Sequence, residues 1–456
     1  MQKLLAWIDD RFPLTKVWEE HLSKYYAPKN FNFWYYFGSL ALLMLVMQIV
    51  TGIFLTMHYK PDTSLAFASV EYIMRDVDWG WLIRYMHSVG ASFFFIVVYL
   101  HMFRGLLYGS YRNPRELIWL IGMVIFVALM AEAFMGYLLP WGNMSYWGAQ
   151  VIISLFDAIP VIGPGLSEWI RGDFVVADAT LNRFFAFHVI AVPLILAALV
   201  FMHIVALHKV GSNNPDGVEI KKKKGPDGNP LDGIPFHPYY TVKDIVGVVV
   251  FLMLFSAVIF FAPDLGGWFL EADNFMPANI LQTPPDIVPL WYFTPFYSIL
   301  RASTDQMLLV LNGVVIAMAT LTFFTVRGFI SKLISFLIGV LLLIGLYALQ
   351  AKLWGVILMG LSLVMFFFLP WLDRSPVKSI RYRGWMYKLA LAIFVTSFIV
   401  LGFLGTKSPD AINLVLFKNV RWAQLCTVLY FLFFFLMPWY TKLDKTKPVP
   451  ERVTSK

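Results

Sequence analysis

Four histidines stand in two long apolar stretches of the chain, where a polar side chain needs a specific partner. His87 and His101 are 14 residues apart, and His188 and His203 are 15 residues apart. In an α-helix of about 100° and 1.5 Å per residue, either spacing keeps both imidazoles on one face, roughly 21–23 Å apart along the axis. Two such helices would offer two pairs of imidazoles at two depths.

Pairs of neutral imidazoles are known ligands of haem iron. One further apolar span separates the two stretches, so both cross a membrane in the same direction. His87 then faces His188, and His101 faces His203. A single histidine in a membrane helix is more often a packing or pore residue, but two matched pairs favour two haems stacked through the membrane.

Glycines recur at the same interval in the neighbouring spans. They are Gly38 and Gly52 in the first span, and Gly122 and Gly136 in the third. Because a glycine inside a helix costs about 1 kcal/mol relative to alanine, each needs a reason. One reason is close contact between helices. The other is room for a flat macrocycle level with each pair of histidines.

Two arginines accompany the histidines, since Arg84 and Arg104 each lie three residues from one of them. Guanidinium groups suit haem propionates, which are carboxylates. Interfacial arginines also extend to water without any ligand, so this second interpretation stays open.

The composition requires a membrane protein of the all-α class. Of 456 residues, 59% are hydrophobic and 14% are charged, and the mean hydropathy is +0.68. About ten apolar runs are long enough to span a bilayer. They lie near 34–57, 80–108, 115–138, 181–208, 242–262, 306–326, 330–350, 353–371, 386–405 and 421–439. The first residues are charged and amphipathic, which predicts a surface helix and no cleavable signal peptide.

The charges indicate the orientation in the membrane. Basic residues, Lys221–Lys224 among them, gather in the loops after every second span, and acidic residues gather in the opposite loops. The positive-inside rule then places both termini in the cytoplasm and His87 near the outer face. Lys407, Lys418 and Arg421 fit this pattern less well. The net charge of +8 is explained by these loops, so no nucleic-acid partner is expected.

The only cysteine is Cys426, in the last span. One cysteine excludes the CxxCH motif of covalent haem and an iron–sulfur cluster held by this chain alone. Both haems are therefore expected to be non-covalent, and any such cluster must belong to another polypeptide.

The predicted organisation has three parts. Residues 1–210 form a four-helix haem-binding bundle, 211–240 a cytoplasmic linker rich in Gly, Pro and Lys, and 241–456 a C-terminal transmembrane region. Between the third and fourth spans, Asn143–Ile170 is expected to form short interfacial helices.

Five runs of sequence resemble a known family. They are RYMHSVGASFFFIVVYLHMFRGLLYGSY, FMGYLLPWGNMSYWGAQVI, RFFAFH, LHKVGSNNP and FHPYYTVKDI. The chain resembles cytochrome b of the bacterial respiratory cytochrome bc complex, a quinol–cytochrome c reductase, over about 1–303 and again from near 352. The resemblance implies two b haems that join an outer and an inner quinone site. It also implies a Rieske iron–sulfur protein, a c-type cytochrome and a homodimeric complex, in contact with quinone and lipid in the bacterial inner membrane.

The resemblance implies an outer quinol-oxidising site in the third span and in loop 264–303. Its residues are Phe134, Tyr137, Gly148, Val151, Ile152, Pro289, Leu290, Trp291, Tyr292 and Tyr297. From the residues alone, Trp291 and Tyr292 could equally anchor the loop at the headgroup level. Leu290 stands where the family usually has a glutamate that takes a quinol proton. We expect Asp286 to supply this carboxylate, and the alternative is an exposed loop aspartate.

The inner site would reduce quinone with protons from the cytoplasm. The resemblance points to His208, at the end of the fourth span, and to Lys243 and Asp244, at the start of the fifth. Charged residues at the start of a helix are also common as caps or topology signals.

Two further features depart from the family. The 15-residue spacing in the fourth span is often 14, and Pro193 could adjust the helix locally. Residues 304–351 form an additional apolar hairpin, which raises the usual eight spans to ten and preserves the sidedness of the downstream spans. We expect this hairpin to face lipid or another subunit.

Two other functions are compatible with histidines in a membrane. One is a two-haem anchor that only relays electrons to quinone, which the outer-site loop argues against. The other is a secondary transporter with a proton path. A transporter would show no b-haem absorption bands.

Overall fold

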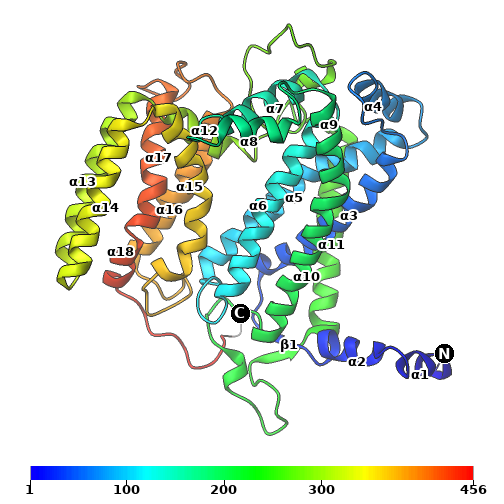
Figure 1. The fold of residues 1–456 in the computed structure, drawn as a ribbon. Helices are drawn as coiled ribbons and strands as arrows, with labels where there is room; N and C mark the ends of the chain where they lie inside the picture. The colour runs from blue at the N-terminus through cyan, green and yellow to red at the C-terminus, as the bar shows by residue number, and fades with distance from the viewer. Residues whose placement is uncertain (1, 455–456) are drawn as a thin grey trace.

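The computed structural model describes residues 2–454, and the chain is almost entirely helical (Figure 1). Among these residues nine helices are long and apolar enough to cross a membrane, and a bent pair supplies a tenth. The nine are α3 Tyr36–Thr56, α5 Gly80–Tyr108, α6 Glu116–Leu138, α9 Asp178–Ala186 continued by α10 Val192–Val210, α11 Phe236–Phe261, α13 Asp305–Thr325, α14 Phe329–Ala348, α15 Ala351–Leu372 and α16 Trp385–Gly405. The prediction of about ten spans is confirmed.

The tenth span is broken, which the sequence pattern did not predict. It consists of α17 Asn419–Phe435 and α18 Met437–Leu443, bent by 60°. Pro438 lies directly after the break, and proline at the first turn of a helix needs no N–H partner. The chain therefore turns at this point before it leaves the membrane region.

The remaining elements are short. They are α1 Gln2–Asp9, α2 Leu14–Trp18, the π-helical turn η1 Glu19–Ser23, β1 Tyr26–Pro28, η2 Phe33–Tyr35, α4 Ala66–Arg75, α7 Asn143–Phe156, α8 Gly163–Arg171, the π-helical turn η3 Phe187–Ala191, η4 Ile220–Lys222, β2 Gly233–Pro235, η5 Ala272–Phe275 and α12 Thr294–Ala302. Helices α7 and α8 lie across one end of the bundle, in the region where short helices were expected (Figure 1). We call this the α7–α8 end, and the opposite end the β1–β2 end.

The N-terminal half is a bundle in which α3 packs on α5 and α6 packs on α10. Its fourth span is not a regular helix, because the π-helical turn η3, which contains His188, interrupts it. A π-helical turn accommodates one residue more than an α-helical turn. This extra residue explains why His188 and His203 share a face although 15 residues separate them, and Pro193 lies just after the turn.

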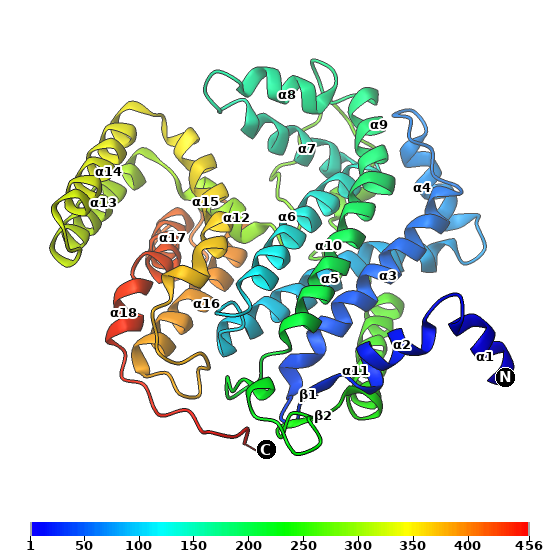
Figure 2. The same ribbon diagram turned by 60° about the horizontal axis from the view of Figure 1, so that its bottom comes forward.

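The C-terminal half packs α12 against α15, α16 and α17. The additional hairpin, α13 and α14, packs on itself and stands at the edge of the molecule in both views (Figures 1 and 2). Most of its large apolar side chains are exposed, as they would be against lipid. The hairpin is held at its entry by Thr304, whose Oγ1 accepts a hydrogen bond from Gln424 at 2.9 Å.

The predicted linker is an ordered part of the fold. β2 within it pairs antiparallel with β1, so that Tyr26 lies opposite Pro235. The C-terminal tail returns to the same loop, where Arg452 Nε donates to Asp232 at 2.7 Å. Burial opposes ionisation of Asp232, but Arg452 and Lys29 outweigh it and lower the pKa of this carboxyl to about 2. Helix α11 begins at Phe236, inside the expected linker.

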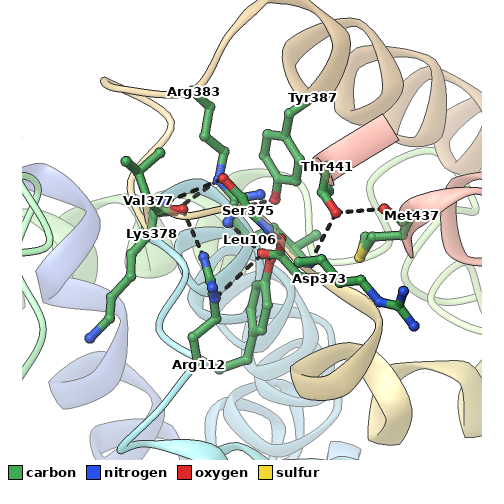
Figure 3. A network of polar contacts seen from close by, with 12 residues as sticks. Leu106, Arg112, Asp373, Ser375, Val377, Lys378, Arg383, Tyr387, Met437 and Thr441 are labelled. Carbon is green, nitrogen blue, oxygen red and sulfur yellow. Dashed lines mark hydrogen bonds and ion pairs between the residues drawn. The ribbon is translucent and has the colours of Figure 1, made fainter. Parts of the chain in front are cut away.

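A buried polar network joins the two halves of the molecule (Figure 3). The carboxylate of Asp373, at the end of α15, accepts a hydrogen bond from Tyr111 at 2.7 Å and is paired with Arg383. Tyr387 on α16 donates to the carbonyl of Leu106 on α5 at 2.8 Å. Since α5 belongs to the N-terminal half, these bonds fix the position of α15 and α16 against it.

Candidate functional site

The structure brings the four histidines together in two pairs. The ring centres of His87 and His188 are 6.1 Å apart, and those of His101 and His203 are 6.4 Å apart. A metal–nitrogen bond of about 2 Å, added to the roughly 1.1 Å between a ring nitrogen and the ring centre, separates two opposed imidazoles by about 6 Å. Both pairs therefore stand at the separation that one iron ion between them requires. We call them the first tier (His87, His188) and the second tier (His101, His203).

The Nδ1 atoms of the first tier have partners. Nδ1 of His87 lies 2.9 Å from Oγ1 of Thr51. Nδ1 of His188 lies 3.0 Å from both the carbonyl oxygen and Oε1 of Glu132. A partner at Nδ1 fixes the ring orientation and leaves Nε2 for a metal. In the second tier, by contrast, the Nδ1 atoms of His101 and His203 are buried and form no well-made hydrogen bond to any described group.

Each of the four glycines lies against one of these histidines. The pairs are Gly38 with His101, Gly52 with His87, Gly122 with His203 and Gly136 with His188. A Cβ at Gly136 would come within 2.3 Å of Cε1 of His188, and at the other three positions within 3.2–3.3 Å of the facing Cε1. Glycine thus lets each helix approach the ring of its neighbour and holds that ring in place. The space expected beside a macrocycle is used by the imidazoles themselves.

Both arginines lie where a carboxylate could reach them. Arg84 lines a cavity of about 240 Å³ that the first tier also bounds. At the second tier, the Arg104 guanidinium lies 5.0 Å over the ring of Tyr35, and its Nε is buried without a hydrogen-bond partner. A buried cation with an unused donor is suited to an anionic ligand group. The residues present therefore fit two haems with bis-histidine ligation.

The same cavity extends from the first tier to the predicted outer quinol site. Tyr137, Leu290 and Tyr292 line it. Tyr292 is only 1% exposed and stacks on Phe95 at 3.9 Å, so it is a core residue and does not anchor the loop at a membrane surface. A Cβ at Gly148 would lie 3.7 Å from Cε1 of Tyr137, which places this glycine beside the cavity wall.

The other residues predicted for the outer site do not line this cavity. They are Phe134, Val151, Ile152, Pro289, Trp291 and Tyr297. Phe134 packs on Phe184 at 5.5 Å, and Trp291 donates to Oγ of Ser92 at 3.0 Å. The Tyr297 hydroxyl donates to the carbonyl of Ile287 at 3.2 Å. These contacts hold the loop and the helices that surround the cavity.

Asp286 is not placed as expected. Its side chain is exposed to solvent, it does not line the cavity, and the charge that it faces is that of Arg301. The carboxylate next to the cavity is Glu271, whose Oε2 accepts a hydrogen bond from the Tyr137 hydroxyl at 3.0 Å. In the sequence, Glu271 was one of several acidic residues in an outer loop and carried no distinguishing spacing.

Glu132 is a second residue that sequence reasoning missed. It is an acidic residue in the middle of an apolar span, and such residues usually have a specific function. That signal alone could have identified it. The structure places its carboxylate at the first tier, where it also lines the cavity.

At the β1–β2 end, the residues predicted for the inner site lie along a run of aromatic rings. His208 stacks on Tyr25 at 4.5 Å, and Tyr25 is 6.2 Å from Phe236. Phe236 is 5.9 Å from Tyr240, and Nζ of Lys243 lies 5.2 Å from the Tyr240 ring. Asp244 follows Lys243 in α11. The residues from α10 and α11 are thus connected through this aromatic run.

Comparisons with known proteins agree with this geometry. The family model described as Cytochrome b/b6/petB matches residues 22–211, and the one described as Cytochrome b(C-terminal)/b6/petD matches residues 277–431. The chain is 59% identical to the protein named Cytochrome b of Allochromatium vinosum, over 99% of this chain and 98% of that protein. It is 41% identical to Cytochrome b of Rhodobacter capsulatus, over 98% and 93% of the two chains.

A solved structure is also similar. A chain of a hyperthermophilic respiratory Complex III superposes with a TM-score of 0.78 at 34% identity, covering 96% of this chain and 99% of that one. The alignment with the Allochromatium vinosum protein spans 457 positions and nearly all of both chains. That relative must therefore contain a segment about as long as the hairpin 304–351.

Proposed function

The chain belongs to the cytochrome b family, and from this premise we propose how its own residues serve quinol–cytochrome c reduction in a respiratory bc complex. His87 and His188 hold one b haem, and His101 and His203 hold the other. The observation that carries this assignment is the ring separation of 6.1 Å in one pair and 6.4 Å in the other. When bound, each haem accepts and releases one electron. The chain provides the ligands, their orientation and the electrostatic surroundings.

The orientation in the membrane is part of the proposal. The basic residues Lys221–Lys224 and the C-terminal tail lie at the β1–β2 end, whereas the acidic loop that contains Glu271 lies at the α7–α8 end. By the positive-inside rule the β1–β2 end faces the cytoplasm of a bacterium, and so do both termini. The first tier is then the outer one.

Quinol is oxidised at the outer cavity beside the first tier. Leu290 and Tyr292 form an apolar wall that excludes water, and Tyr137 presents a hydroxyl to the bound ring. Quinone is reduced at the inner end, where His208, Lys243 and Asp244 lie within reach of cytoplasmic protons. Because release occurs outside and uptake inside, turnover adds to the proton gradient.

The electron acceptors outside this chain are part of the same proposal. A Rieske iron–sulfur protein takes one electron at the outer face and passes it to a c-type cytochrome. The family's assembly is a homodimer of the complex. The hairpin α13 and α14 faces lipid or another subunit of that assembly, because its apolar side chains are exposed in this chain.

A reduced-minus-oxidised optical spectrum of the purified complex tests the proposal. We expect two b-type haems per chain, and quinol-dependent reduction of cytochrome c that is blocked separately by inhibitors of an outer and an inner quinone site. A colourless, iron-free protein would support a transporter instead. Sensitivity to one class of inhibitor only would support a simple haem anchor.

A further inference from the structure

We propose that Glu271 is the catalytic carboxylate that takes a proton from quinol at the outer cavity, and that it replaces the glutamate absent at Leu290. The inference rests on the proposed function, since it needs a quinol in this cavity. It concerns one step of that function and can fail while the remainder holds.

The first argument is position. The Glu271 carboxylate accepts a hydrogen bond from Tyr137 at 3.0 Å, and the Tyr137 side chain lines the cavity. Leu270 and Asn274, on either side of Glu271, line it too, as does Leu290. The carboxylate therefore stands one hydrogen bond from the space that a quinol ring would occupy, on the same wall as the residue it replaces.

The second argument is that the loop is fixed. Oδ1 of Asn274 accepts hydrogen bonds from the backbone N–H and the hydroxyl of Ser145, at 2.9 and 2.7 Å. The N–H of Asn143 donates to the carbonyl of Met276 at 2.9 Å. These bonds attach the loop that contains Glu271 to the start of α7. A general base must be held within hydrogen-bond reach of its proton, and this attachment meets that need.

The third argument is the set of groups around the carboxylate. The titratable side chains that face Glu271 are Tyr137 from α6, Tyr292 from the loop before α12, and Asp273 from its own loop. None of them is a cation that would keep the carboxylate ionised at low pH. Burial raises the pKa of Glu271 to about 7; the Tyr137 hydrogen bond opposes this rise and the charge of Asp273 adds to it. A base with a pKa near the working pH can both accept and release a proton.

Quinol loses two electrons and two protons when it is oxidised. One electron leaves to the iron–sulfur centre of the partner protein and one to the first-tier haem, both named above as acceptors. As one quinol O–H bond breaks, its proton forms the O–H bond of a neutral Glu271 carboxylic acid, and the second proton leaves with the iron–sulfur partner or water. Glu271 then releases its proton to water at the α7–α8 end.

The test compares variants of the intact complex in membranes. Glu271→Gln keeps the shape and a hydrogen-bonding group but cannot accept the proton, so we expect quinol oxidation to slow by at least about tenfold. Its pH profile should also lose the ionisation near neutral pH. Asp264→Asn removes an exposed carboxylate of the same loop and is the matched control, with an expected change of less than about twofold. The double variant Glu271→Gln, Leu290→Glu restores a carboxylate at the family's usual position and should recover most of the rate.

Each result has one meaning. Both b-haem bands must persist in every variant, which shows that the protein is folded and that the proposed function is intact. If Glu271→Gln keeps the wild-type rate and pH profile, the inference is wrong. A loss in Asp286→Asn without any loss in Glu271→Gln would return the proton to Asp286. A colourless wild-type complex would instead contradict the proposed function.

Discussion

The two tiers of histidines have the same ligands but different surroundings. In the first tier both Nδ1 atoms have partners, Thr51 for one ring and Glu132 for the other. This tier also opens onto the cavity that reaches the outer quinol site. In the second tier the Nδ1 atoms of His101 and His203 lack a well-made hydrogen bond to any group in the described part of the chain.

This difference shows which part of the site the ligand spacing determines and which part the neighbours determine. The spacing along α5 and along α10 gives two equivalent pairs. The residues on α3 and α6 then make the pairs unequal, because a carboxylate beside one imidazole increases its basicity and stabilises the oxidised metal. An electron that moves from the first tier to the second would move away from that carboxylate.

The largest expected effect comes from removal of a ligand. His188→Leu should eliminate the first-tier haem and leave the second, and His203→Leu should do the reverse. Haem content per chain and the reduced-minus-oxidised spectrum measure this. Retention of both b haems in either variant would show that the tiers do not hold metal as described.

Glycine substitutions should separate the tiers less completely. Gly136→Ala places a Cβ 2.3 Å from Cε1 of His188, so the ring must move and the first-tier haem content should fall by more than half. Gly122→Ala is the matched control, because its Cβ would be 3.2 Å from Cε1 of His203, and a small shift accommodates it. Equal losses in the two variants would contradict the difference in closeness between the tiers.

A smaller effect is expected from Glu132→Gln. Without the carboxylate at Nδ1 of His188, the midpoint potential of the first-tier haem should rise, on the order of tens of millivolts, while that of the second tier stays the same. A potentiometric titration followed optically resolves the two. An unchanged first-tier potential would mean that Glu132 does not tune this haem.

The smallest effect lies outside both tiers. The carboxyl of Asp232 has its pKa lowered from 3.8 to about 2, so its contribution to stability is present above pH 4 and is lost as the pH falls from about 4 to 2. Acidification through this window, or Asp232→Asn at neutral pH, should free the C-terminal tail for proteolysis. Both haem spectra should stay unchanged at neutral pH in that variant. A tail that remains resistant would show that Arg452 holds it by other bonds.

Much of the fold could be predicted because its signals are local. Runs of about twenty apolar residues gave the spans, and the intervals between histidines and between glycines gave the faces that meet. The bend before Met437 was missed, since an apolar run continues through it. The π-helical turn at His188 was also missed, although the extra residue in the spacing was its trace.

The carboxylates were harder to assign from sequence. Asp286 was favoured because it lies close in sequence to Leu290, but the loop folds so that Asp286 faces solvent and Glu271, 19 residues before Leu290, reaches the cavity. Closeness in a long loop says little about closeness in space. The bonds from Asn274 to Ser145 that decide the matter connect distant parts of the chain and have no sequence signature.

A redox titration of the purified complex, with haem counted per chain, tests the central claim most directly. The account predicts two b haems in each chain that titrate as separate one-electron transitions, with the first-tier haem at the lower potential. A single haem per chain, or none, would contradict it.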